Sequence, residues 1–356
     1  MPTIQQFLED LLMTTLKLNA SDLHLNVGYY PTLRVDGTLV PLTNFQVLTP
    51  DATRELAFQL LGSRKDELSV EKEIDFSYAF RDKARFRINA YFQKSFISVA
   101  LRLIQTKINT IEELNLPATL HELSHIKQGF VLICGPAGHG KSTTMASIID
   151  EINHIRAEHI ITIEDPIEYV FFGDKSIIDQ REVGFDTKGF HRALRSVLRE
   201  DPNVIMIGEM RDPITMSAAL TAAETGHLVL ASLHTNSAAQ TIDRIIDSFT
   251  ASQQAQIRIQ LATTLSAVIS QRLLPRRAGG RLPATEILFT TPAVKTLIRE
   301  QKTHQIDLVI ETNIERGMIS LNRSLAELVR RGEILGEVAV NYSPNPTELT
   351  MMLQRS

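Results

Sequence analysis

A glycine-rich segment, FVLICGPAGHGKSTT, spans residues 130–144 and carries the residue types that bind phosphate. Gly135, Gly140, Lys141 and Ser142 satisfy the pattern G-x-x-x-x-G-K-[ST]. Glycines let backbone N–H groups turn toward phosphate oxygens, and the helix that follows points its positive end at the same place. Lys141 is expected to reach the β- and γ-phosphates, and the Ser142 hydroxyl to bind Mg²⁺. The sequence therefore predicts an ATP-binding loop made of Gly135, Pro136, Ala137, Gly138, His139, Gly140, Lys141, Ser142 and Thr143.

Three further polar clusters each follow a predicted apolar strand. Glu164 follows the strand expected at 160–163, Glu209 follows the run VIMIG, and His234 follows the strand expected at 227–233. Because ligands of open α/β sheets bind at the carboxyl ends of the strands, we expect these clusters to meet the phosphate loop. Taken singly, strand-end carboxylates are as often helix caps, and histidines as often surface groups. Together, downstream of one phosphate loop, they favour catalysis.

ATP hydrolysis needs ligands for Mg²⁺, a group that orients water, and positive charge at the γ-phosphate. Glu209 and Glu164 are the candidates for orienting water and for holding Mg²⁺ with Ser142. Lys141 is the fixed positive charge, and His234 is a further candidate catalytic residue.

An additional cation could come from the N-terminal part of the chain. Arg85 and Arg87 alternate with Phe86 and Ile88, so they lie on the face opposite the apolar one, and Arg102 lies on the polar face of the next strand. These arginines are either a solvated sheet face or arginine fingers that reach the phosphates of a nucleotide bound elsewhere.

The elements that must position these residues divide the 356-residue chain into two predicted domains. Residues 1–104 form an α+β domain, with helices at 4–18 and from 50, a hairpin at 33–40, and strands up to 104. Residues 105–120 are a predicted linker. Residues 121–356 alternate strand and helix, which is typical of a parallel α/β sheet. There we expect one long helical stretch over 237–272, a strand at 284–289 and short helices beyond.

Composition excludes several classes of protein. The chain has 37 Lys and Arg against 41 Asp and Glu, a net charge of −4, which argues against a dedicated nucleic-acid binder. Cys134 is the single cysteine, so an internal disulfide or a multi-cysteine zinc site is excluded. We expect no transmembrane segment, because no apolar run reaches about 18 residues, and no signal peptide, because the N-terminus lacks a basic segment.

The chain resembles the type II/IV secretion and type IV pilus ATPase superfamily, with motifs in the same order over about residues 4–330. These motifs are ASDLHL at 20–25, RVDG at 34–37, RFRINA at 85–90, the Walker A loop, the Asp box at 162–168, QREVG at 180–184, the Walker B at 207–212 and the His box at 225–236. The segment AVKTLIRE at 293–300 is similar to a helix associated with retraction in members that retract pili.

The resemblance implies a PAS-like N-terminal domain joined to a RecA-like P-loop NTPase domain, and a homo-hexamer. Nucleotide would lie between the domains, where Arg85, Arg87 and Arg102 would close over it. The implied activity is Mg²⁺-dependent ATP hydrolysis that drives type IV pilus retraction and twitching motility. The implied location is the cytoplasmic face of the inner membrane, reached through the pilus platform protein, with a paralogous retraction ATPase as a further partner.

Two departures from the family pattern are visible. Ala137 and His139 replace the usual Thr and Ser of the loop, and the retraction-type helix differs at Val294, Lys295 and Thr296. An accessory retraction ATPase is therefore the first alternative. A pilus-extension or secretion ATPase would have a four-cysteine metal site, a nucleic-acid motor would have a basic, aromatic-bearing surface, and a ring subunit that only binds nucleotide would lack the glutamates.

Overall fold

A computed structural model of the chain describes residues 3–35, 37–81, 83–104 and 107–354. They fall into two compact units, Met1–Lys107 with Pro166–Val170, and Ile108–Asp165 with Phe171–Ser356. Asp36 of the predicted hairpin turn and residues 105–106 of the predicted linker lie outside the described residues. Among the helices in the described ranges, none combines the length and the apolar character needed to cross a bilayer.

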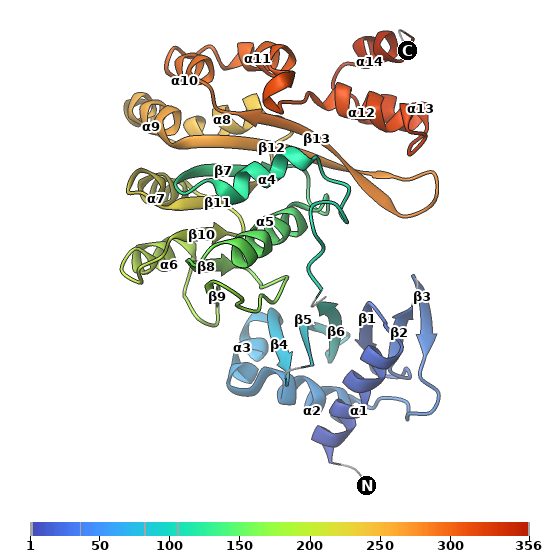
Figure 1. Ribbon diagram of the computed structural model, residues 1–356. Coiled ribbons are helices and arrows are strands. Elements are labelled where there is room, and N and C mark those ends of the chain that lie inside the picture. Colours follow the sequence, from blue (N-terminus) through green and yellow to red (C-terminus); the bar gives the residue numbers. More distant parts are fainter. Residues whose placement is uncertain (1–2, 36, 82, 105–106, 355–356) are drawn as a thin grey trace. The chain divides into compact units, whose positions relative to one another are not determined.

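The first unit is an antiparallel sheet with helices packed against its apolar face. The strand order is β3-β2-β1-β6-β5-β4 (Figure 1). Its elements are α1 (Ile4–Lys17), β1 (Asp22–Leu25), β2 (Thr32–Val35), β3 (Thr38–Pro41), α2 (Pro50–Leu61), α3 (Lys65–Glu71), β4 (Glu73–Phe80), β5 (Ala84–Gln93) and β6 (Phe96–Ile104). The helices and hairpin expected from the sequence are confirmed, whereas the short helix α3 was not predicted.

Strand β5 shows how the sequence pattern sets the two faces of this sheet. Phe86 and Ile88 are fully buried in the core of the unit, together with Leu11 of α1. Arg85 and Arg87 are half-buried on the opposite face, as alternation along a strand requires. The expectation that these arginines lie opposite the apolar face is confirmed.

The second unit is built on a mostly parallel sheet with the order β13-β12-β7-β11-β10-β8-β9, whose strands Figure 1 shows stacked through the unit. Its strands are β7 (Gly129–Cys134), β8 (His159–Glu164), β9 (Ile177–Glu182), β10 (Val204–Ile207), β11 (Leu228–Leu233), β12 (Leu265–Pro275) and β13 (Arg281–Phe289). Only β12 and β13 pair antiparallel among the strands of this sheet in the described ranges.

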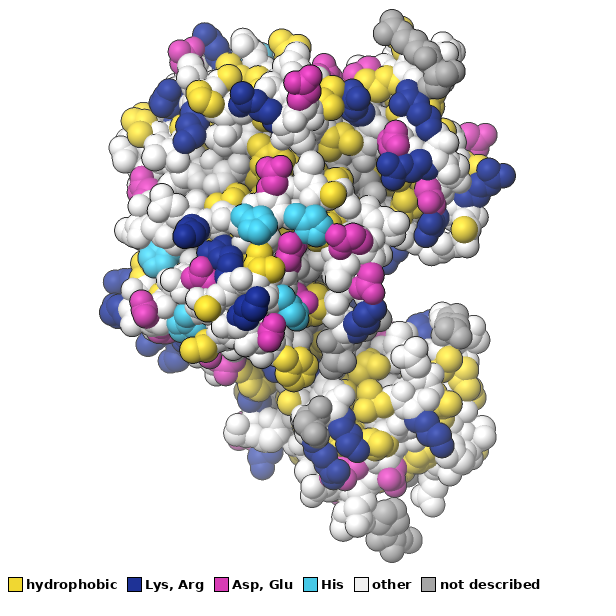
Figure 2. All heavy atoms as spheres, in the orientation of Figure 1, with side chains coloured by type: hydrophobic (Ala, Val, Ile, Leu, Met, Phe, Trp, Pro, Cys, Tyr) yellow, Lys and Arg dark blue, Asp and Glu magenta, His cyan; other side chains and the backbone are white. Residues whose placement is uncertain are grey.

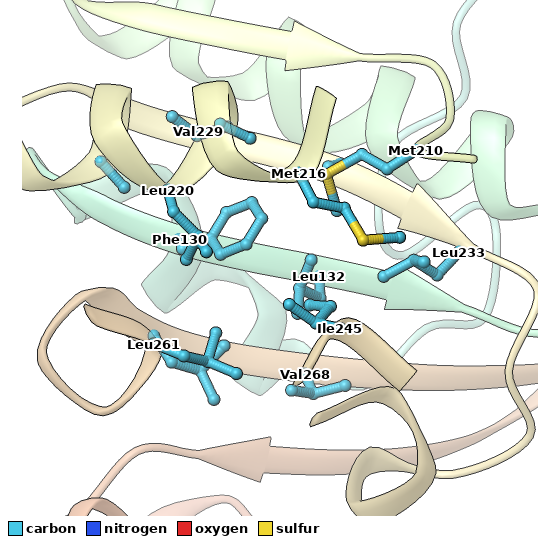
Figure 3. Packing of buried hydrophobic residues seen from close by; sticks show 14 of the residues in the cluster. Phe130, Leu132, Met210, Met216, Leu220, Val229, Leu233, Ile245, Leu261 and Val268 are labelled. Carbon is cyan, nitrogen blue, oxygen red and sulfur yellow. The ribbon is translucent and has the colours of Figure 1, made fainter. Parts of the chain in front are cut away.

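Helices cover both faces of this sheet. They are α4 (His121–His125), α5 (Lys141–Ile155), α6 (Phe190–Val197), α7 (Pro213–Glu224), α8 (Ala238–Asp247), α9 (Ala251–Thr264), α10 (Pro292–Arg299), α11 (Ile306–Thr312), α12 (Leu321–Arg330), α13 (Gly336–Tyr342) and α14 (Pro346–Gln354). Figure 3 shows Phe130 and Leu132 of β7 packed with Leu220 of α7, Ile245 of α8 and Leu261 of α9. These side chains form one buried core, which fixes the strands that carry the polar clusters.

The predicted long helix over residues 237–272 is wrong. Helices α8 and α9 fill its first part, but residues 265–275 form strand β12. Leu265 follows Thr264 directly, so no loop or glycine marks the change from helix to strand. The apolar run from Ala267 to Ile269 fits a buried helix as well as a buried strand, and its pairing with β7 decides for the strand.

Candidate functional site

The phosphate loop joins β7 to α5 and is packed tightly against β12. Gly135 and Gly140 have φ angles of 146° and 82°, in the region that favours glycine. A Cβ atom on Gly135 would lie 2.4 Å from the carbonyl oxygen of Gln271. A Cβ atom on Gly140 would lie 2.8 Å from the Nε2 of the same glutamine. These two glycines are therefore required by close contact with β12 as well as by the turn itself.

Lys141 begins α5 and lies over the loop, with only 7% of its surface exposed. Its Nζ donates to the carbonyl oxygens of Gly135 at 2.9 Å and of Pro136 at 3.0 Å. The residue before the helix is Gly140, which has no side chain to cap the first N–H groups. An ammonium group beside the N-terminus of a helix is a donor set that suits phosphate oxygens.

Lys141, His234 and Glu209 form a continuous chain of contacts. Lys141 Nζ lies 3.4 Å from His234 Nδ1, and His234 Nε2 lies 3.1 Å from Glu209 Oε2. An ammonium can only donate, so Nδ1 must accept, and Nε2 carries the proton that is donated to Glu209. The second oxygen of Glu209 pairs with Arg211. The structure thus brings together three of the residues that the sequence singled out.

Glu164 is the last residue of β8. This strand pairs with β10, which precedes Glu209 in the chain, and Glu164 is 5% exposed. Its Oε1 accepts hydrogen bonds from Thr162 Oγ1 at 2.6 Å and from Gln180 Nε2 at 3.1 Å. The N–H of Gly208, the residue before Glu209, donates to Ile163 O at 2.8 Å. Glu164 therefore lies beside the Glu209 segment and is held in one orientation. The roles of Thr162 and Gln180 were not predicted, although both lie in motifs found in the sequence.

The residues present fit a magnesium ion held mainly by the nucleotide. Among the residues that the structure describes, no three His, Cys, Asp or Glu side chains come together as a metal site. Mg²⁺ in nucleotide sites needs only one or two carboxylates, because phosphate oxygens and water complete its shell. Ser142, Glu209 and Glu164 carry the hydroxyl and carboxylate oxygens that such a set would require. Asp212, in contrast, caps α7 by accepting from Thr215 N at 2.8 Å.

His139, an unusual residue in a phosphate loop, ties the loop to β12. Its Nδ1 accepts a hydrogen bond from the backbone N–H of Leu273 at 2.9 Å. Burial lowers the pKa of His139, and the nearby charges of Arg272 and Lys141 lower it further. This contact requires the neutral ring with its proton on Nε2, because Nδ1 must be unprotonated to accept a hydrogen bond.

A recess of about 370 Å³ adjoins the loop within the second unit. Gly140, Thr143 and Leu273 line it, with Asn115 and Leu116 on another side. This volume is within the usual range for small-molecule pockets. On the face displayed in Figure 2, histidine side chains lie beside acidic ones in the middle of this unit, so titratable groups there are within reach of solvent.

The three candidate arginines, Arg85, Arg87 and Arg102, have different local surroundings. Arg85 donates to Ser77 Oγ at 2.6 Å, and Arg87 lies opposite Arg102 in the pairing of β5 with β6. Arg102 is ion-paired with Asp22 at 2.9 Å. Burial alone would raise the pKa of Asp22, but hydrogen bonds from Ser21 and Arg102 outweigh burial and hold that pKa below its usual value.

Glu286 of β13 is a buried carboxylate that was not predicted as a site residue from the sequence. It is 8% exposed, and its Oε1 accepts from the N–H of Ala238, the first residue of α8, at 2.7 Å. Burial raises its pKa to about 7. The side chain fixes the start of the helix that follows the His234 loop.

We predict that His139→Ala destabilises the second unit, because the N–H of Leu273 loses its acceptor. The expected loss is about 1–3 kcal/mol of unfolding free energy, measured by urea denaturation. His139→Asn is the matched control, because its amide oxygen can still accept. Equal stability of the Ala variant and the wild type would contradict the assigned contact.

We predict that Glu286→Gln stabilises the protein at high pH. The folded pKa of about 7 exceeds the ordinary 4.5, so wild-type stability falls as pH rises between these values and the full cost applies above pH 7. A glutamine keeps the acceptor for Ala238 and removes a penalty of up to about 3 kcal/mol. Urea denaturation should show the gain at about pH 8 and a much smaller one at about pH 5.

The exposed Glu315 provides the control for this prediction, as Glu315→Gln should leave stability unchanged at both pH values. A Glu286→Gln variant whose stability relative to the wild type is the same at both pH values would show that Glu286 does not titrate as its burial requires.

Comparison with known proteins places the chain in a family. The model of the family described as "Type II/IV secretion system protein" matches residues 2–318. The type IV pilus retraction ATPase PilT of Pseudomonas aeruginosa is 44% identical over 93% of this chain and 96% of its own length. The type IV pilus ATPase PilU of the same organism is 38% identical over 97% of this chain and 91% of its own length.

A solved structure similar to this one is the crystal structure of the pilus retraction motor PilT with bound ADP. It matches with a TM-score of 0.90 and 46% identity, over 96% of this chain and 98% of the solved chain. This chain has the α/β fold and the two-unit organisation of that solved structure. The chain belongs to the type II/IV secretion system protein family.

Proposed function

We propose that this chain is an ATP hydrolase that drives the retraction of type IV pili, and hence twitching motility, as a homo-hexameric ring. The observation that carries the proposal is the contact chain from Lys141 through His234 to Glu209 at the carboxyl ends of neighbouring parallel strands. It connects the residue that would bind the γ-phosphate to a carboxylate that would act on water. Family membership and the likeness to PilT support the pilus role.

In the proposed reaction, Glu209 orients a water molecule toward the γ-phosphorus and receives its proton. The new O–P bond forms as the bond to the β–γ bridging oxygen breaks, and that electron pair leaves with ADP. The Nε2–H of His234 holds the Glu209 carboxylate in position. Lys141 exchanges the loop carbonyls for phosphate oxygens and offsets the charge that develops there.

Ser142, Glu209 and Glu164 would hold Mg²⁺, with Glu164 fixed by its two hydrogen bonds. Bound there, Mg²⁺ would neutralise charge on the β- and γ-phosphates. The recess beside Thr143 would accept the nucleoside part of ATP, since it adjoins the phosphate loop.

The two units would correspond to a PAS-like domain of residues 1–104 and a RecA-like ATPase domain of residues 121–356, joined by a linker at 105–120. Arg85, Arg87 and Arg102 would supply the additional cation by closing over the nucleotide as the domains move. A head-to-tail interface that closes on itself would give the ring. The ring would work on the cytoplasmic face of the inner membrane, bound to the pilus platform protein.

We predict that Glu209→Gln lowers ATP turnover by about 100-fold or more while nucleotide binding is retained, because the loss of the carboxylate removes the proton acceptor. Phosphate release and the binding of a fluorescent ATP analogue measure the two effects. Cells that carry only this variant should keep extended pili that do not retract. Glu122→Gln, on the exposed face of α4, is the control. Wild-type turnover in Glu209→Gln would remove Glu209 from the proposed reaction.

We predict that Arg87→Ala and Arg102→Ala each lower turnover at saturating ATP by about tenfold or more, without unfolding the second unit. Arg54→Ala provides the comparison, since Arg54 is an exposed arginine of the same unit that pairs only locally with Asp51. If both variants turn over ATP at the rate of Arg54→Ala, these arginines belong to a solvated sheet face and do not act as fingers.

A further inference from the structure

Strand β12, whose residues 265–272 were predicted as helix, contacts both loops of the site. It pairs with β7, the strand that leads into the phosphate loop. Successive side chains of a strand point to opposite faces of the sheet. Gln271 therefore faces α5 and the phosphate loop, whereas Ser270 and Arg272 face the segment that follows His234.

Gln271 holds the phosphate loop through both ends of its amide. It is 2% exposed, its Nε2 donates to the carbonyl oxygen of His139 at 2.9 Å, and its Oε1 accepts from Thr144 Oγ1 at 2.7 Å. The backbone N–H of Leu273, two residues on, donates to the ring of His139. A buried amide with donor and acceptor both engaged fixes the loop and the first turn of α5 relative to β12.

Arg272 holds the other loop. One guanidinium nitrogen donates to the carbonyl oxygen of Asn236 at 3.1 Å and to its Oδ1 at 2.9 Å, and Ser270 Oγ donates to the same carbonyl at 2.9 Å. The second terminal nitrogen, Nη1, donates to the carbonyl oxygen of Gln271 at 3.1 Å. Asn236 lies two residues after His234, so these contacts set where the imidazole lies.

We propose that Gln271 and Arg272 are positioning residues for ATP hydrolysis, and that β12 keeps the phosphate loop in register with the His234 loop. This inference rests on the proposed function. The imidazole of His234 must reach Lys141 on one side and Glu209 on the other, and a displacement of about 1 Å costs about 100-fold in rate in such sites. The two residues act on different loops, so their loss has different kinetic consequences.

The experiment compares Arg272→Met with Gln271→Met in the full-length protein. Arg272→Met should lower kcat about tenfold or more, as expected when a charge-assisted hydrogen bond is lost, with the Kd of a fluorescent ATP analogue changed less than about twofold. Gln271→Met should instead raise that Kd by about tenfold. Arg272→Lys, which keeps a cationic donor, should recover part of kcat.

A double-mutant cycle tests whether Arg272 acts through Asn236. The variant Arg272→Met/Asn236→Ala should have the kcat of Arg272→Met alone, because Arg272→Met already removes the contact with Asn236 Oδ1 that Asn236→Ala removes. Multiplied losses in the double variant, or the same pattern of kcat and Kd changes in Arg272→Met as in Gln271→Met, would overturn the proposal.

Hydrogen exchange gives a readout that does not depend on turnover. Arg272→Met should speed amide exchange in residues 234–238 and leave residues 135–140 unchanged, and Gln271→Met should do the reverse. Uniform changes in both segments would show a general structural role and overturn the proposal. Absence of ATP turnover in the wild type would instead overturn the proposed function, and the exchange pattern would still decide the role of β12.

Discussion

Parallel pairing of β7, β11, β10 and β8 is the constraint on which the site depends. Each strand ends at the same edge of the sheet, so the phosphate loop, His234, Glu209 and Glu164 come from neighbouring strand ends although they are far apart in the sequence. The buried apolar residues of these strands provide the rigidity, since a shift of register would move each polar side chain away from its partner. Chemistry at this edge therefore depends on the packing of apolar residues that take no part in the reaction.

Much of this site could be predicted because its signals are local. Glycine spacing identifies the phosphate loop, and four apolar residues before Glu209 identify a buried strand with a carboxylate at its end. Alternation in β5 placed Arg85 and Arg87 on one face for the same reason, since the period of a strand is fixed by its geometry. The contact of His234 with both Lys141 and Glu209 follows from strand order, which a single sequence does not contain.

The contacts that could not be predicted are those between distant segments without a local pattern. His139 meets Leu273 across 134 positions, and Gln271 meets Thr144 across 127. Residues 265–272 were misassigned because an apolar run after a helix fits either structure, and tertiary pairing with β7 decided it. The same error concealed Arg272, whose partners become visible only when β12 is recognised as a strand beside the His234 loop.

We propose that Lys141, His234 and Glu209 work as one unit on ATP. A structure of the full-length protein with Mg²⁺ and a non-hydrolysable ATP analogue would show whether they do. We expect Lys141 to leave the carbonyl oxygens of Gly135 and Pro136 for the γ-phosphate, while His234 keeps its contact with Glu209. A γ-phosphate bound away from Lys141, or Glu209 turned away from His234 and the phosphates, would contradict it.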